Sequence, residues 1–97
     1  MELNLAVGKA LKRSRAAAGK TQVDFSAISS RTYMSALERG LQSPTLEKLA
    51  ELCELLGTHP VSLLAAAYLI KDGMTADEFL QTVAEELKVL GFDASQA

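Results

Sequence analysis

The stretch TQVDFSAISSRTYMSALERG, residues 21–40, determines how this chain is interpreted. It predicts a short helix, a tight turn and a second helix that ends at Gly40. The second helix begins with polar side chains at residues 30–33 and carries Met34 and Leu37 on one face. A helix of this kind is held by its apolar face while its N-terminal end points outward. That is the geometry needed to place a helix end in the major groove of DNA.

Length and composition indicate one small globular unit. The chain has 97 residues, of which 48% are hydrophobic, so it can form a real core. Strand-like alternation of β-branched residues is not apparent, and Leu, Ala, Glu and Lys dominate. We therefore expect an all-α fold.

Start and stop signals divide the chain into six expected helices. Their ranges are 4–18, 21–25, 29–39 or 30–39 (with Ser29 or Ser30 as the N-cap), 45–56, 60–70 and 75–90. In the short helix, Thr21 is the expected N-cap, Val23 and Phe25 supply the apolar contacts, and Ile28 fills the core from the turn that follows. The apolar stripe of the fourth helix is expected to begin at Leu46.

The last expected helix has two strong local signals at its start. Thr75 and Glu78 fit a capping box, and Met74 and Phe79 fit a hydrophobic staple. We expect residues 1–72 to form the main unit and residues 73–97 to add a C-terminal helix that belongs to the same compact domain.

Charge is distributed unevenly along the chain. The net charge of −2 by itself argues against a nucleic-acid-binding protein. Residues 1–40, however, hold seven basic and three acidic side chains, whereas residues 41–97 hold three basic and nine acidic ones. This pattern favours one surface suited to phosphates and one that repels them, although two solvated faces with an accidental bias remain an alternative.

The chain offers few groups for catalysis or metal binding. Cys53 is the only cysteine and is expected to be a small core residue. His59, the only histidine, precedes Pro60 at a helix start and is expected to be structural. With no nucleophile–base pair, glycine-rich phosphate loop or ligand cluster apparent, we expect no enzyme activity, no cofactor and no metal. We also expect a cytoplasmic protein, since neither a signal peptide nor a membrane span is recognisable.

The chain contains several short motifs at a characteristic spacing. They are Val7-Gly8 with Leu11, Thr21-Gln22 after Gly19, Ser30-Arg31 through Leu37-Glu38-Arg39-Gly40, Ser43-Pro44-Thr45-Leu46, and the run from Leu49 to Leu56-Gly57. Together they resemble the Cro/C1-type helix-turn-helix family, also called the XRE family, over about 60% of the chain. The resemblance implies a lambda-repressor-like domain of five helices that binds double-stranded operator DNA, usually as a dimer on a palindromic site.

The resemblance also implies roles for individual residues. Base reading falls to Arg31, Thr32 and Ala36. Because many relatives carry a longer, base-contacting side chain at the position of Ala36, either fewer direct base contacts are made or Ala36 meets a thymine methyl. Arg31 presents donors that match the O6 and N7 acceptors of guanine, although contact with phosphate alone is the alternative. The residues expected to contact the DNA backbone are Gln22, Ser30, Tyr33, Gln42, Ser43, Lys12 and Lys20.

The chain departs from the family pattern in its turn. The stretch between Phe25 and Ser30 is about two residues shorter than usual, and Ala27-Ile28 replaces the usual turn glycine. We therefore expect a truncated second helix or turn.

The C-terminal helix has a wider apolar stripe than packing on one small domain requires. Its expected role is an oligomer interface made of Met74, Phe79, Val83, Leu87 and Leu90. Packing on its own domain is the alternative.

The preferred hypothesis is a sequence-specific transcriptional regulator that acts as a homodimer or higher homo-oligomer. A protein-interaction module, such as an antitoxin or an anti-repressor, is the main alternative. A small-ligand sensor is less favoured, because the chain leaves no room for a separate effector domain.

Overall fold

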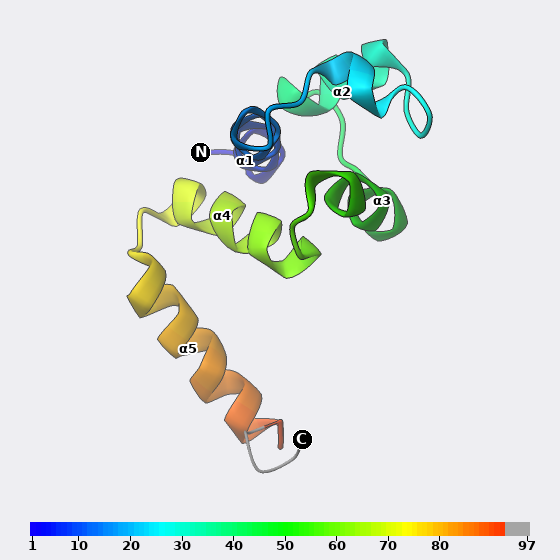
Figure 1. The fold of residues 1–97 in the computed structure, drawn as a ribbon. Helices are drawn as coiled ribbons and strands as arrows, with labels where there is room; N and C mark the ends of the chain where they lie inside the picture. Colours follow the sequence, from blue (N-terminus) through cyan, green and yellow to red (C-terminus); the bar gives the residue numbers. More distant parts are fainter. Residues whose placement is uncertain (93–97) are drawn as a thin grey trace.

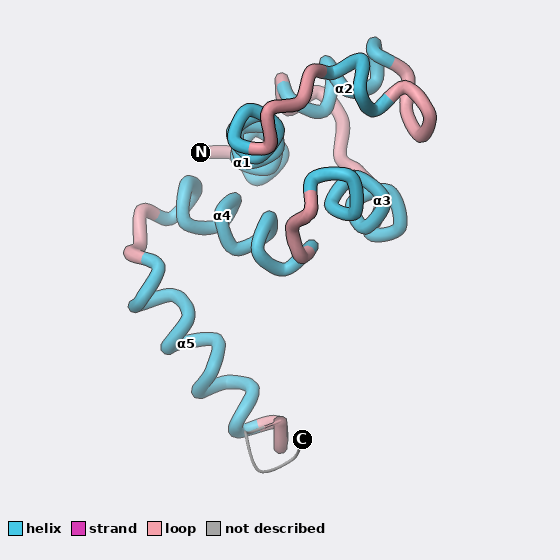
Figure 2. Tube along the Cα trace, viewed as in Figure 1, coloured by secondary structure: helices cyan, strands magenta, loops and turns pink. Residues whose placement is uncertain are grey.

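The computed structural model describes residues 1–92 and consists of helices joined by short loops (Figures 1 and 2). The expected all-α fold is confirmed for these residues. In chain order the elements are α1 (Leu3–Ala17), the 3-10 helix η1 (Gln22–Phe25), α2 (Arg31–Glu38), α3 (Leu46–Leu56), α4 (Pro60–Asp72) and α5 (Ala76–Val89). Residues 93–97, the end of the expected C-terminal segment, lie outside the described part of the chain.

Helix α1 lies at the centre of the fold. It packs against α4 on one side and against α2 on the other, while α3 packs on α4 (Figure 1). The core is apolar, and its largest fully buried side chains are Phe25, Leu11, Met34, Leu37, Leu52 and Leu63. Ile28 packs against this core from the turn between η1 and α2, as expected.

Capping explains most of the helix boundaries. The hydroxyl oxygens of Ser30 and Thr45 accept hydrogen bonds from backbone N–H groups at the starts of α2 and α3. At α4, His59 Nδ1 accepts from the N–H of Val61 at 3.0 Å, so the expected structural role of this histidine is confirmed. Thr75 caps α5, accepting from the N–H of Glu78 at 3.2 Å.

Two expected core contacts are wrong. Val23 is 53% exposed, because the tight 3-10 geometry of η1 turns this side chain outward while Phe25 is buried. Leu46 is 79% exposed, because it is the first residue of α3 and the buried stripe of that helix starts at Leu49.

Helix α5 leaves the body of the molecule. It turns away after Gly73 and touches the rest of the chain mainly near its start (Figure 1). None of its residues is buried, and its clearest anchor is the ring of Phe79, stacked on Tyr68 of α4 with 6.3 Å between centroids. Packing on its own domain, the alternative considered for this segment, is thus seen only at the start of α5.

Within residues 1–92, no single helix is both long and apolar enough to cross a bilayer, although α3 and α4 together pass on length and composition as a pair bent by 102°.

Candidate nucleic-acid interface

The N-terminal end of α2 is open to solvent. Ser30 caps it, with its Oγ accepting from the N–H of Tyr33 at 3.1 Å. The next two side chains, Arg31 and Thr32, are exposed. The hydroxyl of the neighbouring Ser29 is buried and has no hydrogen-bond partner among residues 1–92. Arg31 and Thr32, two of the three residues expected to read bases, are therefore free to meet a ligand in the isolated chain.

The opposite face of α2 is fixed in the core. Met34 and Leu37 are fully buried, and the backbone of α2 approaches α1 closely at Gly8. A Cβ atom on Gly8 would lie 2.6 Å from the carbonyl oxygen of Glu38, so only glycine permits this approach. Gly40, with φ of +75°, ends the helix and lies against the backbone of Leu5.

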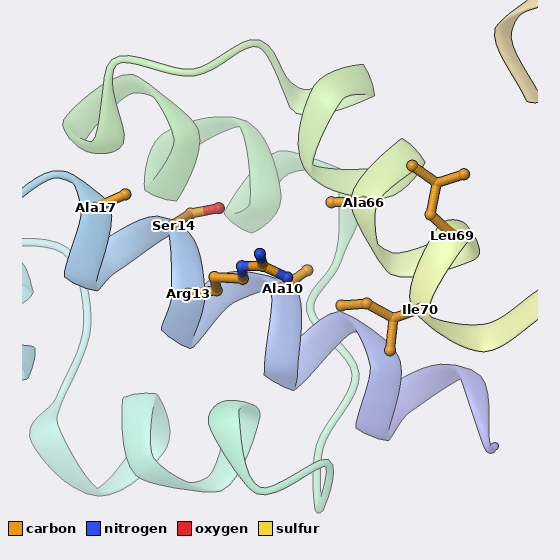
Figure 3. A pocket seen from close by; sticks show the side chains of 7 residues that line it. All are labelled: Ala10, Arg13, Ser14, Ala17, Ala66, Leu69 and Ile70. Atoms are coloured by element: carbon orange, nitrogen blue, oxygen red, sulfur yellow. The ribbon is translucent and has the colours of Figure 1, made fainter. Parts of the chain in front are cut away.

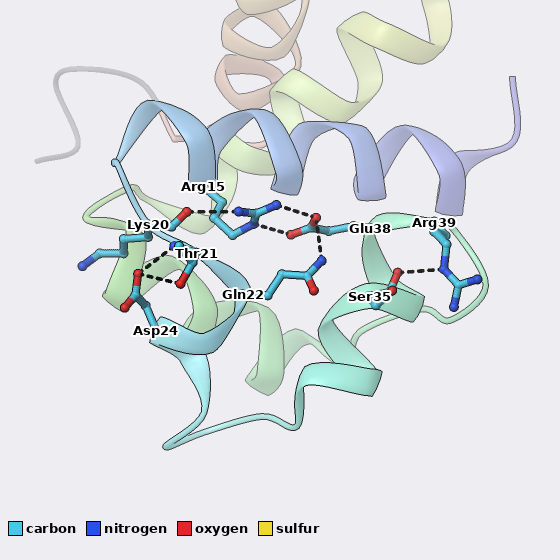
Figure 4. Close-up of polar contacts among 8 residues, drawn as sticks. All are labelled: Arg15, Lys20, Thr21, Gln22, Asp24, Ser35, Glu38 and Arg39. Atoms are coloured by element: carbon cyan, nitrogen blue, oxygen red, sulfur yellow. Dashed lines mark hydrogen bonds and ion pairs between the residues drawn. The ribbon is translucent and has the colours of Figure 1, made fainter.

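A buried ion pair locks the C-terminal end of α2 to α1. The Nε and Nη2 atoms of Arg15 donate to the two carboxylate oxygens of Glu38 at 2.6 and 2.9 Å (Figure 4). Nη1 of the same guanidinium donates to the carbonyl of Lys20 at 3.0 Å. The hydrogen bonds to Glu38 raise the pKa of Arg15. Arg15 is thereby committed to holding two elements together.

Gln22 extends this network to η1. Its Nε2 atom donates to Glu38 Oε1 at 3.1 Å (Figure 4). Because Gln22 is the first residue of η1 and Glu38 the last of α2, this bond fixes one element against the other. Gln22 thus braces η1 against α2, while its contact with phosphate stays a prediction.

Two further contacts hold η1 and the turn that follows it. The N–H of Thr21 donates to Asp24 Oδ2 at 2.6 Å, and mainly for this reason the pKa of Asp24 is lowered. Lys48 of α3 reaches across to donate from Nζ to the carbonyl oxygen of Ile28. The truncated turn expected from the sequence is therefore pinned at its middle by a residue from another helix.

The other predicted DNA contacts surround α2 or lie on α1. Gln42 and Ser43 are exposed in the loop after α2, and Lys12 is exposed on α1. Tyr33 is half-buried and packs against the core. The remaining two predicted residues, Ala36 and Lys20, are each partly exposed. A contact with DNA stays a prediction for all of them.

Two residues that orient α2 were not identified from the sequence. Lys48 gave no signal, because its partner is a backbone carbonyl 20 positions away. Arg15 belongs to a run of cations on α1, and nothing in that run marks it as the partner of Glu38. The useful signal was the position of Glu38, a charged residue on the same helix face as buried Met34 and Leu37.

Cys53 is buried in the core, as expected, and burial raises the pKa of its thiol. A reactive thiolate is disfavoured in such surroundings.

Comparison with known proteins identifies the family. A helix-turn-helix domain model matches residues 6–67, a range that begins within α1, contains η1, α2 and α3, and ends within α4. The chain is also 39% identical over 66 residues to an uncharacterised HTH-type transcriptional regulator, y4dJ, of Sinorhizobium fredii. That match covers 66% of this chain and 86% of the relative. No solved structure gave a significant match. With η1, the turn and α2 forming the motif, this chain belongs to the helix-turn-helix domain family.

Proposed function

We propose that this chain is a DNA-binding transcriptional regulator of the Cro/C1 type, and that α2 is its recognition helix. The observation that carries the proposal is the orientation of α2. Its N-terminal end is exposed at Arg31 and Thr32, whereas its other face is buried and its C-terminal end is clamped by Arg15. A helix fixed in this way presents the same side chains in the same direction each time it meets a duplex.

In this proposal the contacts divide into two classes. Arg31, Thr32 and Ala36 read base edges, and Arg31 pairs with the O6 and N7 atoms of a guanine. Phosphates are contacted by side chains around the motif and on α1, which position the protein without reading sequence. These side chains are Gln22, Ser30, Tyr33, Gln42, Ser43, Lys12 and Lys20.

The regulator acts as a homo-oligomer joined through α5. This is supported by the apolar residues that α5 exposes to solvent, with Leu87 42% and Leu90 69% exposed. Met74 and Phe79 belong to the same interface but are already half-buried. A two-fold dimer reads a palindrome when its two recognition helices lie about 34 Å, or a multiple of that distance, apart.

The test is selection of bound sequences from a random pool of duplexes, followed by the same selection with variants. The parent chain should yield a palindromic motif. Arg31→Ala should relax preference at one base pair in each half-site, with a loss of roughly 1–3 kcal/mol in discrimination. The control is Lys71→Ala, which removes an exposed cation on α4 outside the helix-turn-helix motif and should leave the selected DNA sequence unchanged. Recovery of random sequence by the parent chain would contradict the proposal.

A protein-interaction role is the second candidate, because the exposed apolar face of α5 also suits an unrelated partner. Sedimentation of the purified chain distinguishes the two. A stable dimer favours the regulator, whereas a monomer up to high concentration favours a different partner for α5.

A further inference from the structure

Two apolar hollows open on either side of α4. The first lies between α1 and α4 and has a volume of about 320 Å³ (Figure 3). It is lined mainly by small side chains from α1 and by apolar ones from α4, namely Ala10, Ser14 and Ala17 with Ala66, Leu69 and Ile70. The second hollow, of about 260 Å³, lies between α4 and the start of α5.

The two hollows are parts of one surface. Ala66 and Leu69 line both of them, so the hollows adjoin along α4. We call this the α4 surface and define it by Ala66 and Leu69 together with the two hollows beside them. Val61 and Leu80 continue it at the second hollow and are 59% and 55% exposed. The small side chains leave room for the bulky residues of a partner helix. The exposed apolar side chains around them favour such a contact.

Helix α5 carries side chains of the complementary size. Leu80, Val83, Leu87 and Leu90 follow one another at spacings of three and four residues, which places them along one helix face. The C-terminal half of this face cannot reach the α4 surface of its own chain, because α5 runs away from α4 (Figure 1). The same chain therefore exposes both a groove and the residues that fit it, which is the condition for a self-complementary contact.

Charge supports the same pairing. Helix α5 carries four carboxylates and one lysine between Ala76 and Val89. Arg13 is an exposed cation that lines the first hollow. Glu86 precedes Leu87 and flanks the apolar face of α5. An exposed carboxylate beside the apolar face of α5 and an exposed guanidinium at the first hollow are complementary in charge.

We infer that the α4 surface binds α5 of a second copy of this chain, with Leu87 and Leu90 in the hollows and Glu86 paired with Arg13. The two-fold axis makes the contact occur twice in each dimer. The inference rests on the homo-oligomer in the proposed function and adds the surface that receives α5. Without it, the two α5 helices could pair only with each other.

The experiment measures the dimer dissociation constant of the full chain by sedimentation equilibrium without DNA. Arg13→Glu and Glu86→Arg should each weaken the dimer at least tenfold, and the double variant should return to within about threefold of the parent. Lys9→Glu and Glu47→Arg make the same charge changes at exposed sites outside the α4 surface and should have little effect. Far-UV circular dichroism confirms that each variant is folded.

A second measurement does not depend on charge. Ala66→Cys and Leu90→Cys proteins, mixed and oxidised, should form a covalent heterodimer, because the inferred contact places residue 66 of one copy near residue 90 of the other. The native Cys53 is buried, and the parent chain oxidised in the same way gives the background level of cross-linking.

The outcomes separate the inference from the proposed function. If Leu87→Glu is monomeric while the charge variants dimerise like the parent and no heterodimer forms, then α5 pairs only with α5. The inference is then wrong and the homo-oligomer stands. If the parent chain is monomeric at high concentration, the oligomer and the inference are both wrong, while DNA selection still tests recognition.

Discussion

Glu38 is the only charged residue among the buried residues of the described part of the chain. Its side chain is 4% exposed, and that of its partner Arg15 is 16% exposed. An isolated carboxylate in such a position carries a large desolvation cost, which the two bonds from Arg15 and the third from Gln22 offset. Removing either side chain alone leaves the other without its partner, so the contribution of the pair to stability is largest when only one member is replaced.

Replacing Arg15 with Met should reduce the free energy of unfolding by about 3 kcal/mol, because Glu38 is left buried without its cation. The double variant Arg15→Met with Glu38→Leu should recover most of this loss, since no charge then remains buried. Urea denaturation measures both values. A loss below about 1 kcal/mol in the single variant, the size seen for exposed ion pairs, would show that water already screens the pair.

Helix propensity alone predicts that Gly8→Ala raises the stability of the protein, whereas the surroundings of Gly8 predict that it lowers stability. In an exposed helix interior, this change stabilises by about 1 kcal/mol. Here the new Cβ would meet the backbone of α2 at Glu38, so α1 and α2 must move apart at a cost of about 1–3 kcal/mol. Thermal denaturation should show a lower Tm and a gel-shift assay weaker DNA binding. A higher Tm would mean that the two helices separate freely.

The stabilising effect of Asp24 should depend on pH. Its folded-state pKa is lowered by the backbone N–H of Thr21, so the charged form favours the folded state. This contribution is complete above the ordinary carboxyl pKa of 3.8 and disappears as pH falls through the lower folded value. The Tm of Asp24→Asn should therefore lie below that of the parent at neutral pH and approach it in acid. If the Tm difference between Asp24→Asn and the parent did not change with pH, the loss of stability would come from altered hydrogen-bond geometry and not from the charge of Asp24.

The link between η1 and α2 is held in place by a tertiary contact. It contains no glycine, and the amine of Lys48 bonds the carbonyl of Ile28 in its middle. The side chain of Lys48 is 25% exposed, so it acts from a partly buried position.

Lys48→Met keeps the aliphatic stem and removes the donor. The free energy of unfolding should fall by about 1–2 kcal/mol, because the Ile28 carbonyl loses a charged partner. DNA affinity should fall as well, with the dependence of affinity on salt unchanged, since Lys48 does not bind phosphate in this proposal. Lys48→Arg keeps a donor and should recover part of both losses. A reduced salt dependence in Lys48→Met would instead place this amine on the DNA.

How much of the structure can be predicted from the sequence differs from element to element, for physical reasons. Helix ends followed from local chemistry, as at Ser30, Thr45 and His59, because a cap depends on residues within one turn. Contacts between residues far apart in the sequence could not be predicted from local chemistry. The clamp from Arg15 to Glu38 spans 23 positions, and nothing in the sequence around either residue selects the other. Val23 was placed wrongly because its orientation depends on the change from α to 3-10 geometry.

On the scale of the whole molecule, the charge division gains meaning from the fold. Pairing with Glu38 removes Arg15 from the set of cations free for phosphate. Lys9, Lys12, Arg31 and Arg39 remain exposed on α1 and around α2. The acidic residues of α5 belong to a helix that projects away from this body (Figure 1). A negative net charge and an anionic ligand are therefore compatible, because the carboxylates of α5 lie apart from the exposed cations of α1 and α2.

Salt dependence tests this division quantitatively. Neutralising phosphates releases counterions, so the logarithm of the association constant should fall linearly with the logarithm of salt concentration, with a slope of about −0.9 for each phosphate contacted. Lys12→Ala removes one cation from each copy and so two from a dimer. Its slope should be shallower by about 2 on every sequence, without a change in base preference. Lys71, which pairs with Asp72 at 3.2 Å on α4, provides the matched control, and Lys71→Ala should keep the parent slope. Fluorescence anisotropy from low to moderate salt measures all three slopes. Equal slopes for the parent and Lys12→Ala would remove Lys12 from the phosphate contacts, whereas a change of about 1 would indicate that only one copy of the dimer uses it.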